Sequence, residues 1–256
     1  MEASGSQANQ AFGVDIGGTG IKGAVVDVKT GQLVTERTRI LTPHPATPGA
    51  VAQVVASLVS GAGWRGDIGA TFPAVIKHGV AQSAANVDES WVGTDADKIF
   101  TQAVGAGEVI VLNDADAAGI AEARFGAAKG VRGVVIMLTF GTGIGSALLM
   151  NGVLVPNTEL GHLELDGYDA ESRAAASVRD EHGMSYKKWA LRVNRYMQHV
   201  ERLFTPDLFV VGGGVSKNAD RWVPLLDLNT KVEPAQLLND AGIVGAAIAA
   251  VERLEE

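Results

Sequence analysis

The chain has 256 residues, 46% of them hydrophobic, so it is long enough to bury one large core or two smaller ones. It contains 32 glycines and no cysteine, which excludes disulfides and thiolate-bound zinc. A formal net charge of −8 argues against broad nucleic-acid binding. The first residues are small and polar, and no stretch is long and apolar enough to cross a bilayer. We therefore expect a cytoplasmic protein that binds neither nucleic acid nor membrane.

The first half of the chain is predicted to alternate strands and helices. Apolar runs bounded by turn residues predict strands at 12–16, 21–28, 33–40, 67–72 and 108–112. Valine and leucine at helical spacing predict a helix near 51–59, after a proline-rich run. A second helix is predicted over 114–126, because it opens with an acidic residue, which stabilises a helix N-terminus.

The second half repeats this plan. We predict strands at 134–138 and 208–211, a hairpin of 147–150 and 153–155 around Asn151-Gly152, a helical zone at 172–204, and a final helix at 242–254. Because a strand, a glycine turn and a strand occur twice, the predicted fold is an internally duplicated α/β fold with a cleft between its halves. We place a small N-terminal lobe at 11–112, with the last helix (243–255) packing on it, and a large C-terminal lobe at 113–242.

A glycine-rich turn follows the first predicted strand, within residues 15–22. Glycine lets a backbone approach a ligand closely and point its N–H groups at an anion. The candidate phosphate-binding residues here are Asp15, Gly17, Gly18, Thr19 and Lys22, and Asp15 is also the candidate partner of a magnesium ion. The alternative is a tight turn between two strands that binds nothing.

A second glycine-rich turn follows the strand at 134–138, with Thr139, Gly141, Thr142 and Gly143 as candidate phosphate-binding residues. A dinucleotide-binding fingerprint has similar glycines but opens a helix, whereas an apolar strand and an Asn-Gly hairpin follow this turn. A nicotinamide enzyme is therefore disfavoured. Two such turns predict a chain of phosphates that is held from two sides.

A third run of glycines, 212–214, ends the strand at 208–211. Gly213 and Gly214 are candidates for contact with a nucleotide or another phosphoryl donor. Close packing of the turn against its neighbours is a nearly equal alternative.

Asn113 and Asp114 stand at the end of the apolar strand 108–112, between the first two glycine turns. A hydroxyl that attacks a phosphoryl group has a high pKa and needs a carboxylate to orient it and accept its proton during the transfer. Asp114 is the candidate general base, and Asn113 is a candidate partner of a second hydroxyl. The alternative for Asp114 is an ordinary helix cap.

The pattern Asp-x-Gly-Gly-Thr-x-x-Lys at 15–22 resembles the first phosphate motif of sugar kinases of the actin/hexokinase superfamily. Within that superfamily, Asn113-Asp114, the turn at 141–145 and Glu159-Leu160-Gly161-His162 resemble the ROK family (repressors, open reading frames and kinases). The runs 138–147 and 156–162 are similar to those of actinobacterial polyphosphate glucokinases.

The resemblance covers nearly the whole chain from about residue 12. It implies an actin/hexokinase (ribonuclease H-like) duplicated fold with two lobes around a cleft. It also implies transfer of a phosphoryl group to the 6-hydroxyl of glucose from polyphosphate, ATP or both.

The resemblance also implies the sugar-binding residues. In the family, the Glu and His of this motif contact sugar, which gives Glu159 and His162 here. Asn86 resembles an Asn that precedes a Trp in a sugar-contacting loop, although a local turn bond is an equal alternative. Many relatives then carry a cysteine-rich zinc motif and a further Glu. Because the cysteines are missing, we expect no zinc at this place and choose Glu171 over Glu164 as the last sugar ligand.

Gly79 is a further candidate sugar-binding residue. The chain has Pro73-Ala74 where the family has Pro-Gly, so the shape of the loop near Gly79 stays open.

A basic stripe marks the helical zone. At helical spacing lie Lys188, Arg192, Arg195, His199 and Arg202, beside an apolar stripe. In a chain of net charge −8, this stripe is a candidate track for a long polyanion, with Lys188, Arg192 and Arg195 as donor-binding residues. The alternative is a solvated basic face of a surface helix.

The combined prediction is a magnesium-dependent glucokinase that uses polyphosphate, ATP or both and forms a homodimer. The alternative enzyme is a strictly ATP-dependent kinase of another hexose, such as mannose. A sugar-sensing regulator is disfavoured, because about ten residues precede the first strand and leave no room for a helix-turn-helix.

Overall fold

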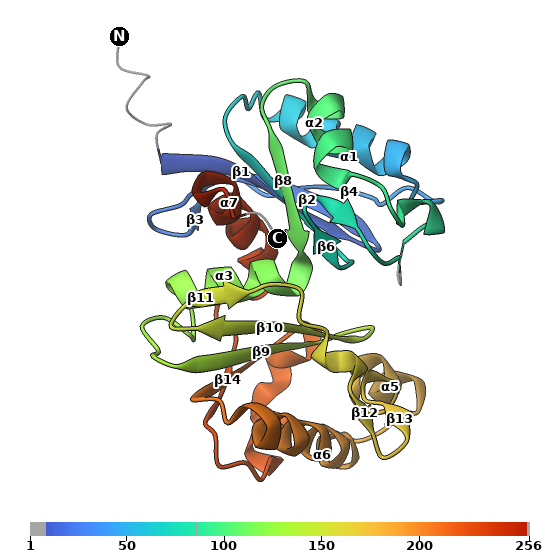
Figure 1. The fold of residues 1–256 in the computed structure, drawn as a ribbon, viewed down its shortest axis with the longest axis vertical. Coiled ribbons are helices and arrows are strands. Elements are labelled where there is room, and N and C mark those ends of the chain that lie inside the picture. Colours follow the sequence, from blue (N-terminus) through green and yellow to red (C-terminus); the bar gives the residue numbers. More distant parts are fainter. Residues whose placement is uncertain (1–8, 85–86, 255–256) are drawn as a thin grey trace. The chain divides into compact units, whose positions relative to one another are not determined.

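The computed structural model describes residues 9–84 and 87–254, and these form two compact units (Figure 1). Unit 1 contains the described residues up to Ala121 and those from Asn239 onward, and unit 2 is Glu122–Leu238. The first boundary therefore falls inside helix α3 (Asp114–Phe125) rather than at residue 112. The early part of α3 belongs to unit 1, because its Ala117 backbone packs against Gly245 of helix α7 (Ala241–Glu252).

Unit 1 has a six-stranded sheet in the order β3-β2-β1-β5-β8, with β4 also paired to β2. The strands are β1 (Gln10–Gly17), β2 (Gly20–Asp27), β3 (Gln32–Leu33), β4 (Thr38–Ile40), β5 (Ile68–Phe72) and β8 (Val109–Asn113). β1 is antiparallel to β2 and parallel to β5, which is parallel to β8. The single strand predicted at 33–40 is wrong, because residues 34–37 leave the sheet and separate β3 from β4.

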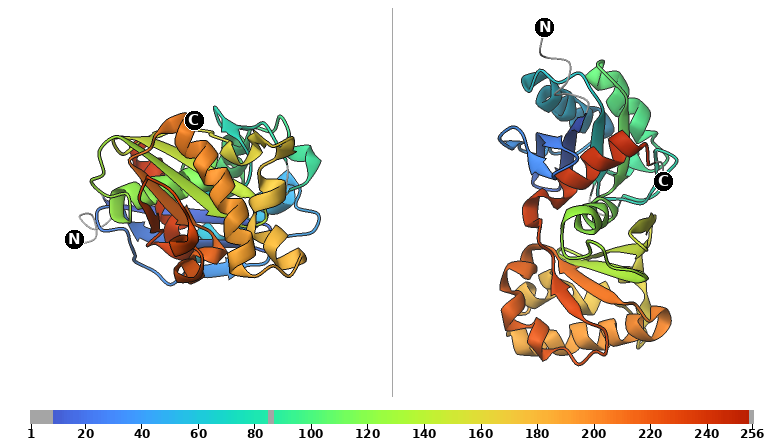
Figure 2. Two further views of the ribbon diagram at one scale, coloured as in Figure 1. Left: turned by 90° about the horizontal axis from the view of Figure 1, so that it is seen from below. Right: turned by 90° about the vertical axis from the view of Figure 1, so that its left-hand side faces the viewer.

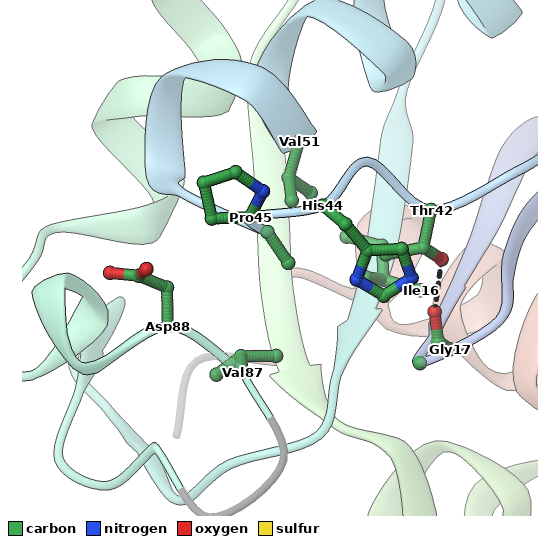
Figure 3. Close-up of a pocket in the computed structure, with 10 residues that line it drawn as sticks. Ile16, Gly17, Thr42, His44, Pro45, Val51, Val87 and Asp88 are labelled. Carbon is green, nitrogen blue, oxygen red and sulfur yellow. Dashed lines mark hydrogen bonds between the residues drawn. The ribbon is translucent and has the colours of Figure 1, made fainter.

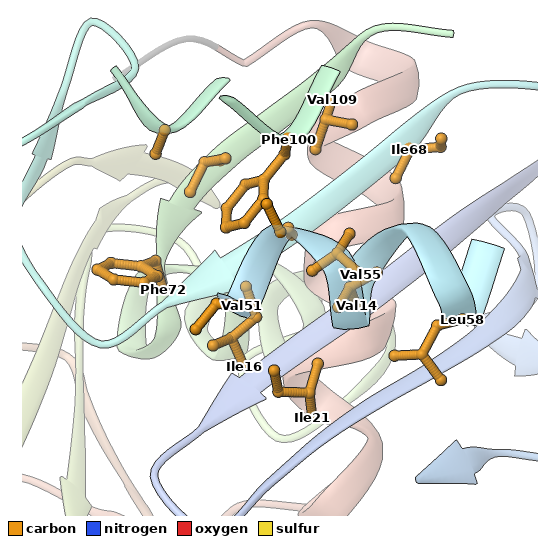
Figure 4. Close-up of a cluster of buried hydrophobic side chains, with 14 of the residues drawn as sticks. Val14, Ile16, Ile21, Val51, Val55, Leu58, Ile68, Phe72, Phe100 and Val109 are labelled. Atoms are coloured by element: carbon orange, nitrogen blue, oxygen red, sulfur yellow. The ribbon is translucent and has the colours of Figure 1, made fainter. Parts of the chain in front are cut away.

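Alternate residues of β1 face opposite layers. Val14 and Ile16 face α1 (Pro48–Gly61), which packs against α2 (Ala96–Val104) in one apolar core (Figure 4). On the other face lies α7, which Figure 2 shows along this sheet. A Cβ added at Gly13 or Gly69 would overlap the α7 backbone. These glycines therefore allow the helix to lie directly on the strands.

Unit 2 repeats the arrangement with a five-stranded sheet in the order β11-β10-β9-β14-β15. Its strands are β9 (Val134–Phe140), β10 (Ile144–Met150), β11 (Val153–Val155), β14 (Leu208–Gly212) and β15 (Val232–Pro234). β9 is antiparallel to β10 and parallel to β14, which is parallel to β15. Because order and direction match unit 1, the predicted duplication is confirmed.

The helical zone predicted at 172–204 is three helices, α4 (Glu171–Ala174), α5 (Ala176–Glu181) and α6 (Tyr186–Phe204). The backbone is extended at Ala175, which separates the first two. The apolar face of α6 is buried against the unit 2 sheet, as the pattern predicts.

Short elements complete the fold. They are the hairpins β6 (Ile76–Lys77) with β7 (Val80–Ala81) and β12 (Glu164–Leu165) with β13 (Tyr168–Asp169), and the 3₁₀ segments η2 (Glu89–Trp91), η3 (Leu160–His162), η4 (Gly214–Arg221), η5 (Val223–Leu225) and η6 (Leu238–Asp240). Among the described residues, no helix combines the length and apolarity needed to cross a membrane.

Candidate functional site

The first glycine turn joins β1 to β2. The pairing of Gly17 with Gly20 leaves a two-residue turn, and Asp15 lies opposite Lys22 in the same ladder. Lys22 Nζ is 3.0 Å from Asp15 Oδ2, and the Thr71 hydroxyl donates to Asp15 Oδ1 at 3.2 Å. Asp15 is therefore fixed through both carboxylate oxygens, and Lys22 is held by Asp15.

Two side chains that were not predicted from the sequence hold the carbonyl groups of this turn. Arg39 donates to the Thr19 carbonyl at 2.8 Å, and the Thr42 hydroxyl donates to the Gly17 carbonyl at 2.5 Å. Gly18 is open, since an added Cβ would have no neighbour within 4 Å. With its carbonyls bonded, the turn has backbone N–H groups to offer an anion.

A pocket of about 230 Å³ adjoins this turn within unit 1 (Figure 3). Gly17 and Gly18 line it together with Thr42, His44 and Asp88. The imidazole of His44 was not predicted as a site residue, because an isolated histidine in a proline-rich run carries no motif. Asn86 lies outside the described residues.

Asn113 and Asp114 mark the junction between β8 and α3. The Asn113 side-chain oxygen accepts from the N–H groups of Ala115 and Asp116 at 2.8 and 3.2 Å, and its amide donates to the Ala74 carbonyl at 3.1 Å. Asn113 therefore caps α3, a role that the sequence analysis considered for Asp114. Asp114 itself is exposed, and Asp114 Oδ1 accepts from the Ala115 N–H at 2.8 Å.

The sheet of unit 1 brings Asp114 and the first glycine turn to one edge. β1 and β8 both run parallel to β5, with Asp15 opposite Thr71 and Thr71 opposite Leu112. Gly17 comes two residues after Asp15, and Asp114 comes two residues after Leu112, so both lie at the carboxyl ends of these strands. Since neighbouring strands are about 4.8 Å apart, the two positions are roughly 10 Å apart. That distance accommodates a phosphoryl group and the hydroxyl that accepts it.

Gly79 lies in the turn between β6 and β7 and packs against the start of α2. Its backbone is left-handed, at φ +74°, and its carbonyl accepts from the Ala96 N–H at 2.7 Å. A Cβ added at Gly79 would lie 2.6 Å from Asp97 Oδ2. These contacts explain the glycine by packing, and its sugar contact stays a prediction.

In unit 2, the second glycine turn joins β9 to β10. The Ser177 N–H donates to the Gly141 carbonyl at 3.0 Å, and its hydroxyl donates to the Thr142 carbonyl at 2.7 Å. Phe140, immediately before the turn, packs edge-on against Trp189 and Trp222. The turn is therefore anchored by an aromatic cluster and by α5, while Gly141 and Thr142 remain exposed.

The third run of glycines adjoins the second turn. Gly212 pairs with Thr139 across β14 and β9. Gly213 has φ +81°, and an added Cβ would overlap the Phe140 backbone, which favours the close-packing explanation for this residue. A Cβ added at Gly214 would meet nothing within 4 Å, so this glycine stays open to a ligand.

The Glu-x-Gly-His motif, residues 159–162, packs closely against β10. A Cβ added at Gly161 would overlap the Ile144 carbonyl, so this glycine allows the motif to lie directly against β10. The Ser146 hydroxyl accepts from the Leu160 N–H at 2.9 Å and donates to the Thr158 carbonyl. The backbone on either side of Glu159 is thereby fixed, and burial raises the pKa of its carboxyl.

His162 and Glu171 lie together, as the choice of Glu171 requires. Glu171 Oε1 is 4.0 Å from His162 Nδ1, while Oε2 accepts from the Ile144 N–H at 2.9 Å, directly beneath Gly143. Glu171 thus connects the second glycine turn to the histidine. His162 Nε2 is 4.0 Å from Glu159 Oε2 on its other side.

Asp169 was not predicted, although it has the shortest contact in this cluster. Its Oδ2 is 2.9 Å from His162 Nδ1. The turn at Asp166-Gly167 folds β13 back on β12 and so returns Asp169 to the histidine. An Asp-Gly pair is a hairpin signal that could have located it. The hydrogen bond from Asp169 raises the pKa of His162, and the nearby carboxylates of Glu171 and Glu159 raise it further.

The donor atoms of His162, Asp169 and Glu171 lie within 4.8 Å of one another, close enough for a metal ion. His162 Nδ1 and Asp169 Oδ2, however, already hydrogen-bond each other directly.

The basic stripe of α6 is partly neutralised. Arg195 bonds both carboxylate oxygens of Asp166, at 2.7 and 3.1 Å, and Arg192 donates to the Arg173 carbonyl at 3.3 Å. Arg195 lowers the pKa of Asp166, with smaller effects from His199 and Arg202. The Lys188 side chain is exposed.

Known proteins resemble this chain over almost its whole length. Residues 11–184 match the ROK family model. The polyphosphate glucokinase of Mycobacterium tuberculosis (strain CDC 1551 / Oshkosh) is 56% identical over 240 residues, which are 94% of this chain and 91% of that protein.

Two crystal structures share the fold. Inorganic polyphosphate/ATP-glucomannokinase from Arthrobacter sp. strain KM has a TM-score of 0.90 and 52% identity, over 96% of this chain and 99% of that one. A ROK family glucokinase from Streptomyces griseus, in complex with glucose and AMPPNP, has a TM-score of 0.81 and 24% identity over 95% and 99%. The predicted fold class, the duplicated two-lobe fold of sugar kinases, is confirmed.

Proposed function

The chain belongs to the ROK family, and from that premise we propose that it transfers a phosphoryl group from inorganic polyphosphate, ATP or both to the 6-hydroxyl of glucose. The observation that carries the proposal is the placement of Asp114 level with the first glycine turn, at one edge of the unit 1 sheet. The mycobacterial relative named polyphosphate glucokinase supports the donor and the acceptor.

Asp114 is the proposed general base. It orients the 6-hydroxyl and accepts its proton as the new O–P bond forms and the bond from that phosphorus to the bridging oxygen of the donor breaks, which releases the shortened donor. Because Asn113 caps α3, the Asp114 carboxylate is not required for that purpose. The N–H groups of Gly17 and Gly18 and the Thr19 hydroxyl bind the transferred group, and Lys22 adds positive charge next to Asp15.

Glu159, His162 and Glu171 are the proposed sugar ligands of unit 2. Two carboxylates and an imidazole suit vicinal hydroxyls, because each hydroxyl can donate one hydrogen bond and accept another. Support comes from their mutual spacing, 4.0 Å from His162 to each glutamate. Asn113, Asn86 and Gly79 complete the proposed set.

A magnesium ion fits the proposal through Asp15. Mg²⁺ prefers oxygen ligands, keeps several waters, and is bound with substrate phosphates by one or two carboxylates. Since both Asp15 oxygens already bond Lys22 and Thr71, Asp15 suits contact through a water molecule. The ion would neutralise charge on the donor phosphates.

Thr139, Thr142 and the glycines of the second turn are the proposed donor site, with Gly213 and Gly214 beside them. Lys188, Arg192 and Arg195 are the proposed extension toward a long polyanion. Homodimerisation and a cytoplasmic location are also part of the proposal, and the exposed Val153 and Val155 on β11 are apolar surface that a second copy could cover.

The direct test is to assay the purified protein with glucose and Mg²⁺, and with either long-chain polyphosphate or ATP, while measuring glucose 6-phosphate. We expect product with polyphosphate. Product with ATP alone would leave an ATP-dependent kinase, and product with neither would overturn the proposal. Mannose in place of glucose tests the alternative acceptor that the name of the Arthrobacter glucomannokinase suggests.

A further inference from the structure

The hydrogen bond between His162 and Asp169 sets which ring nitrogen of the histidine can meet a ligand. Asp169 Oδ2 lies 2.9 Å from His162 Nδ1, and an ionised carboxylate can only accept. The proton must therefore be on Nδ1. The other nitrogen, Nε2, lies on the side of Glu159 Oε2, 4.0 Å away.

We propose that Asp169 is a positioning residue of the sugar site, which holds His162 in the Nδ1–H form and presents Nε2 to a sugar hydroxyl. The inference rests on the proposed glucose site and adds to it a residue that contacts no substrate. A carboxylate that accepts from one imidazole nitrogen commonly decides the tautomer and orientation of the ring.

Asp169 also positions the second sugar ligand. Its Oδ1 accepts from the Glu171 N–H at 3.1 Å, and its carbonyl accepts from the Ser172 hydroxyl at 2.6 Å. The first turn of α4 is thereby tied to the residue that orients His162. One carboxylate fixes both the imidazole and the start of the helix that carries Glu171.

The hairpin keeps Asp169 in place. Asp169 pairs with Glu164 in the β12–β13 ladder, and the Ala170 N–H donates to the Leu163 carbonyl at 2.9 Å. Three carboxylates face the imidazole, those of Glu159, Asp169 and Glu171. Of these, Asp169 makes the direct hydrogen bond to the ring, so its loss affects tautomer and orientation first.

The test compares Asp169→Asn with Asp166→Asn. Both variants change an aspartate of one hairpin into its amide, but Asp166 bonds Arg195 instead of the histidine. An Asn that keeps its side-chain oxygen on the Glu171 N–H places its NH₂ toward Nδ1 and so favours the Nε2–H form. For D169N we expect the KM for glucose to rise about tenfold, the typical cost of a hydrogen bond to a charged group. The kcat and the KM for ATP should change less than about twofold, and D166N should keep the glucose KM of the wild type.

Nitrogen-15 NMR of His162 without substrate is the readout that a merely structural role would not move. At a pH above the raised pKa of His162, where the imidazole is neutral, we expect the Nδ1–H tautomer in the wild type and in D166N, and the Nε2–H tautomer in D169N. Asp169→Glu keeps the carboxylate and should regain part of the glucose affinity. If D169N does not fold, the glucose KM of D169E and the NMR spectrum of the wild type still decide whether Asp169 sets the tautomer of His162.

An unchanged glucose KM in folded D169N would overturn the proposal, as would an Nε2–H tautomer in the wild type. A bound metal that D169N loses would also overturn it, because the metal would then orient the ring. If the wild type phosphorylates no hexose, the proposed function fails, while the NMR comparison still shows whether Asp169 sets the tautomer.

Discussion

At the scale of single residues, the division of roles between two neighbouring side chains matters most. Asn113 and Asp114 are adjacent, and a helix N-terminus needs one of them as its cap. The Asn113 side chain accepts from two N–H groups of α3 and donates to the Ala74 carbonyl. The Asn113 side chain therefore caps α3 without Asp114.

Asp114→Asn should abolish turnover while leaving glucose binding largely intact. An amide keeps the shape and can still hydrogen-bond a hydroxyl, but it does not accept the proton. Loss of a general base costs on the order of 10²–10⁴-fold in rate. The check is kcat beside the glucose-induced rise in melting temperature, and wild-type turnover would remove Asp114 from the mechanism.

His162 should make folding stability depend on pH. Its folded pKa is raised above the ordinary 6.5 by Asp169 and the neighbouring glutamates. The stabilising effect is fully present below pH 6.5 and is lost as pH rises through the folded pKa. His162→Gln should therefore reduce the free energy of unfolding more at pH 6 than at pH 9, measured by urea denaturation. An equal reduction at both pH values would mean that the raised pKa is wrong.

At the scale of secondary structure elements, two glycines decide how α7 meets the unit 1 sheet. Gly69→Ala should destabilise unit 1, because its Cβ would overlap the Ala246 carbonyl and force the helix outward. Overpacking costs about 1–3 kcal/mol and sometimes more. Gly61→Ala, at the end of α1, is the matched control, since no atom lies within 4 Å of its added Cβ. Similar melting temperatures for both variants would contradict the close packing.

The α6 stripe carries a prediction about the donor. Replacing Arg192 and Arg195 with alanine should raise the KM for long polyphosphate more than that for ATP, because a longer polyanion contacts more cations. Each lost contact should also flatten the salt dependence of binding. The control K129A/R132A removes the same charge from an exposed loop. Equal effects on both donors would mean that the stripe is a solvated helix face and not a binding site for polyphosphate.

Local signals explain which elements could be predicted. Apolar strands, glycine turns and the apolar last helix are visible in short windows, and the sequence analysis identifies them. The β12–β13 hairpin is not among them, because strands of two residues show no alternation and only Asp166-Gly167 marks the place. α4 and α5 are not distinguished by the sequence, because helical spacing does not reveal the extended backbone at Ala175 that separates them.

Contacts between distant residues limited the prediction of the site. The Thr71 hydroxyl that fixes Asp15 is 56 positions away, and Arg39 reaches the Thr19 carbonyl from a different strand. No window of the sequence pairs such residues. The family motifs identify Asp114, Glu159 and His162 as candidate site residues. The contact of Asp169 with His162 was found only in the folded structure.

At the scale of the whole molecule, glucose should stabilise the folded chain. A ligand that binds the native state and not the unfolded state stabilises it by about 2.7 kcal/mol at a concentration 100 times its Kd. Glu159→Ala and His162→Ala should each weaken the rise in melting temperature, and Glu164→Ala, a neighbour on β12, should not. If glucose stabilises the first two variants as much as the wild type, the sugar assignment is wrong.

The path of the chain also has a consequence for its synthesis. Unit 1 is assembled from both ends of the sequence, with all of unit 2 inserted between them. A ribosome therefore releases β1, β5 and β8 long before it makes the 12 residues of α7 that cover them. The strands that carry Gly13 and Gly69 therefore lack the helix that covers them until α7 has been made.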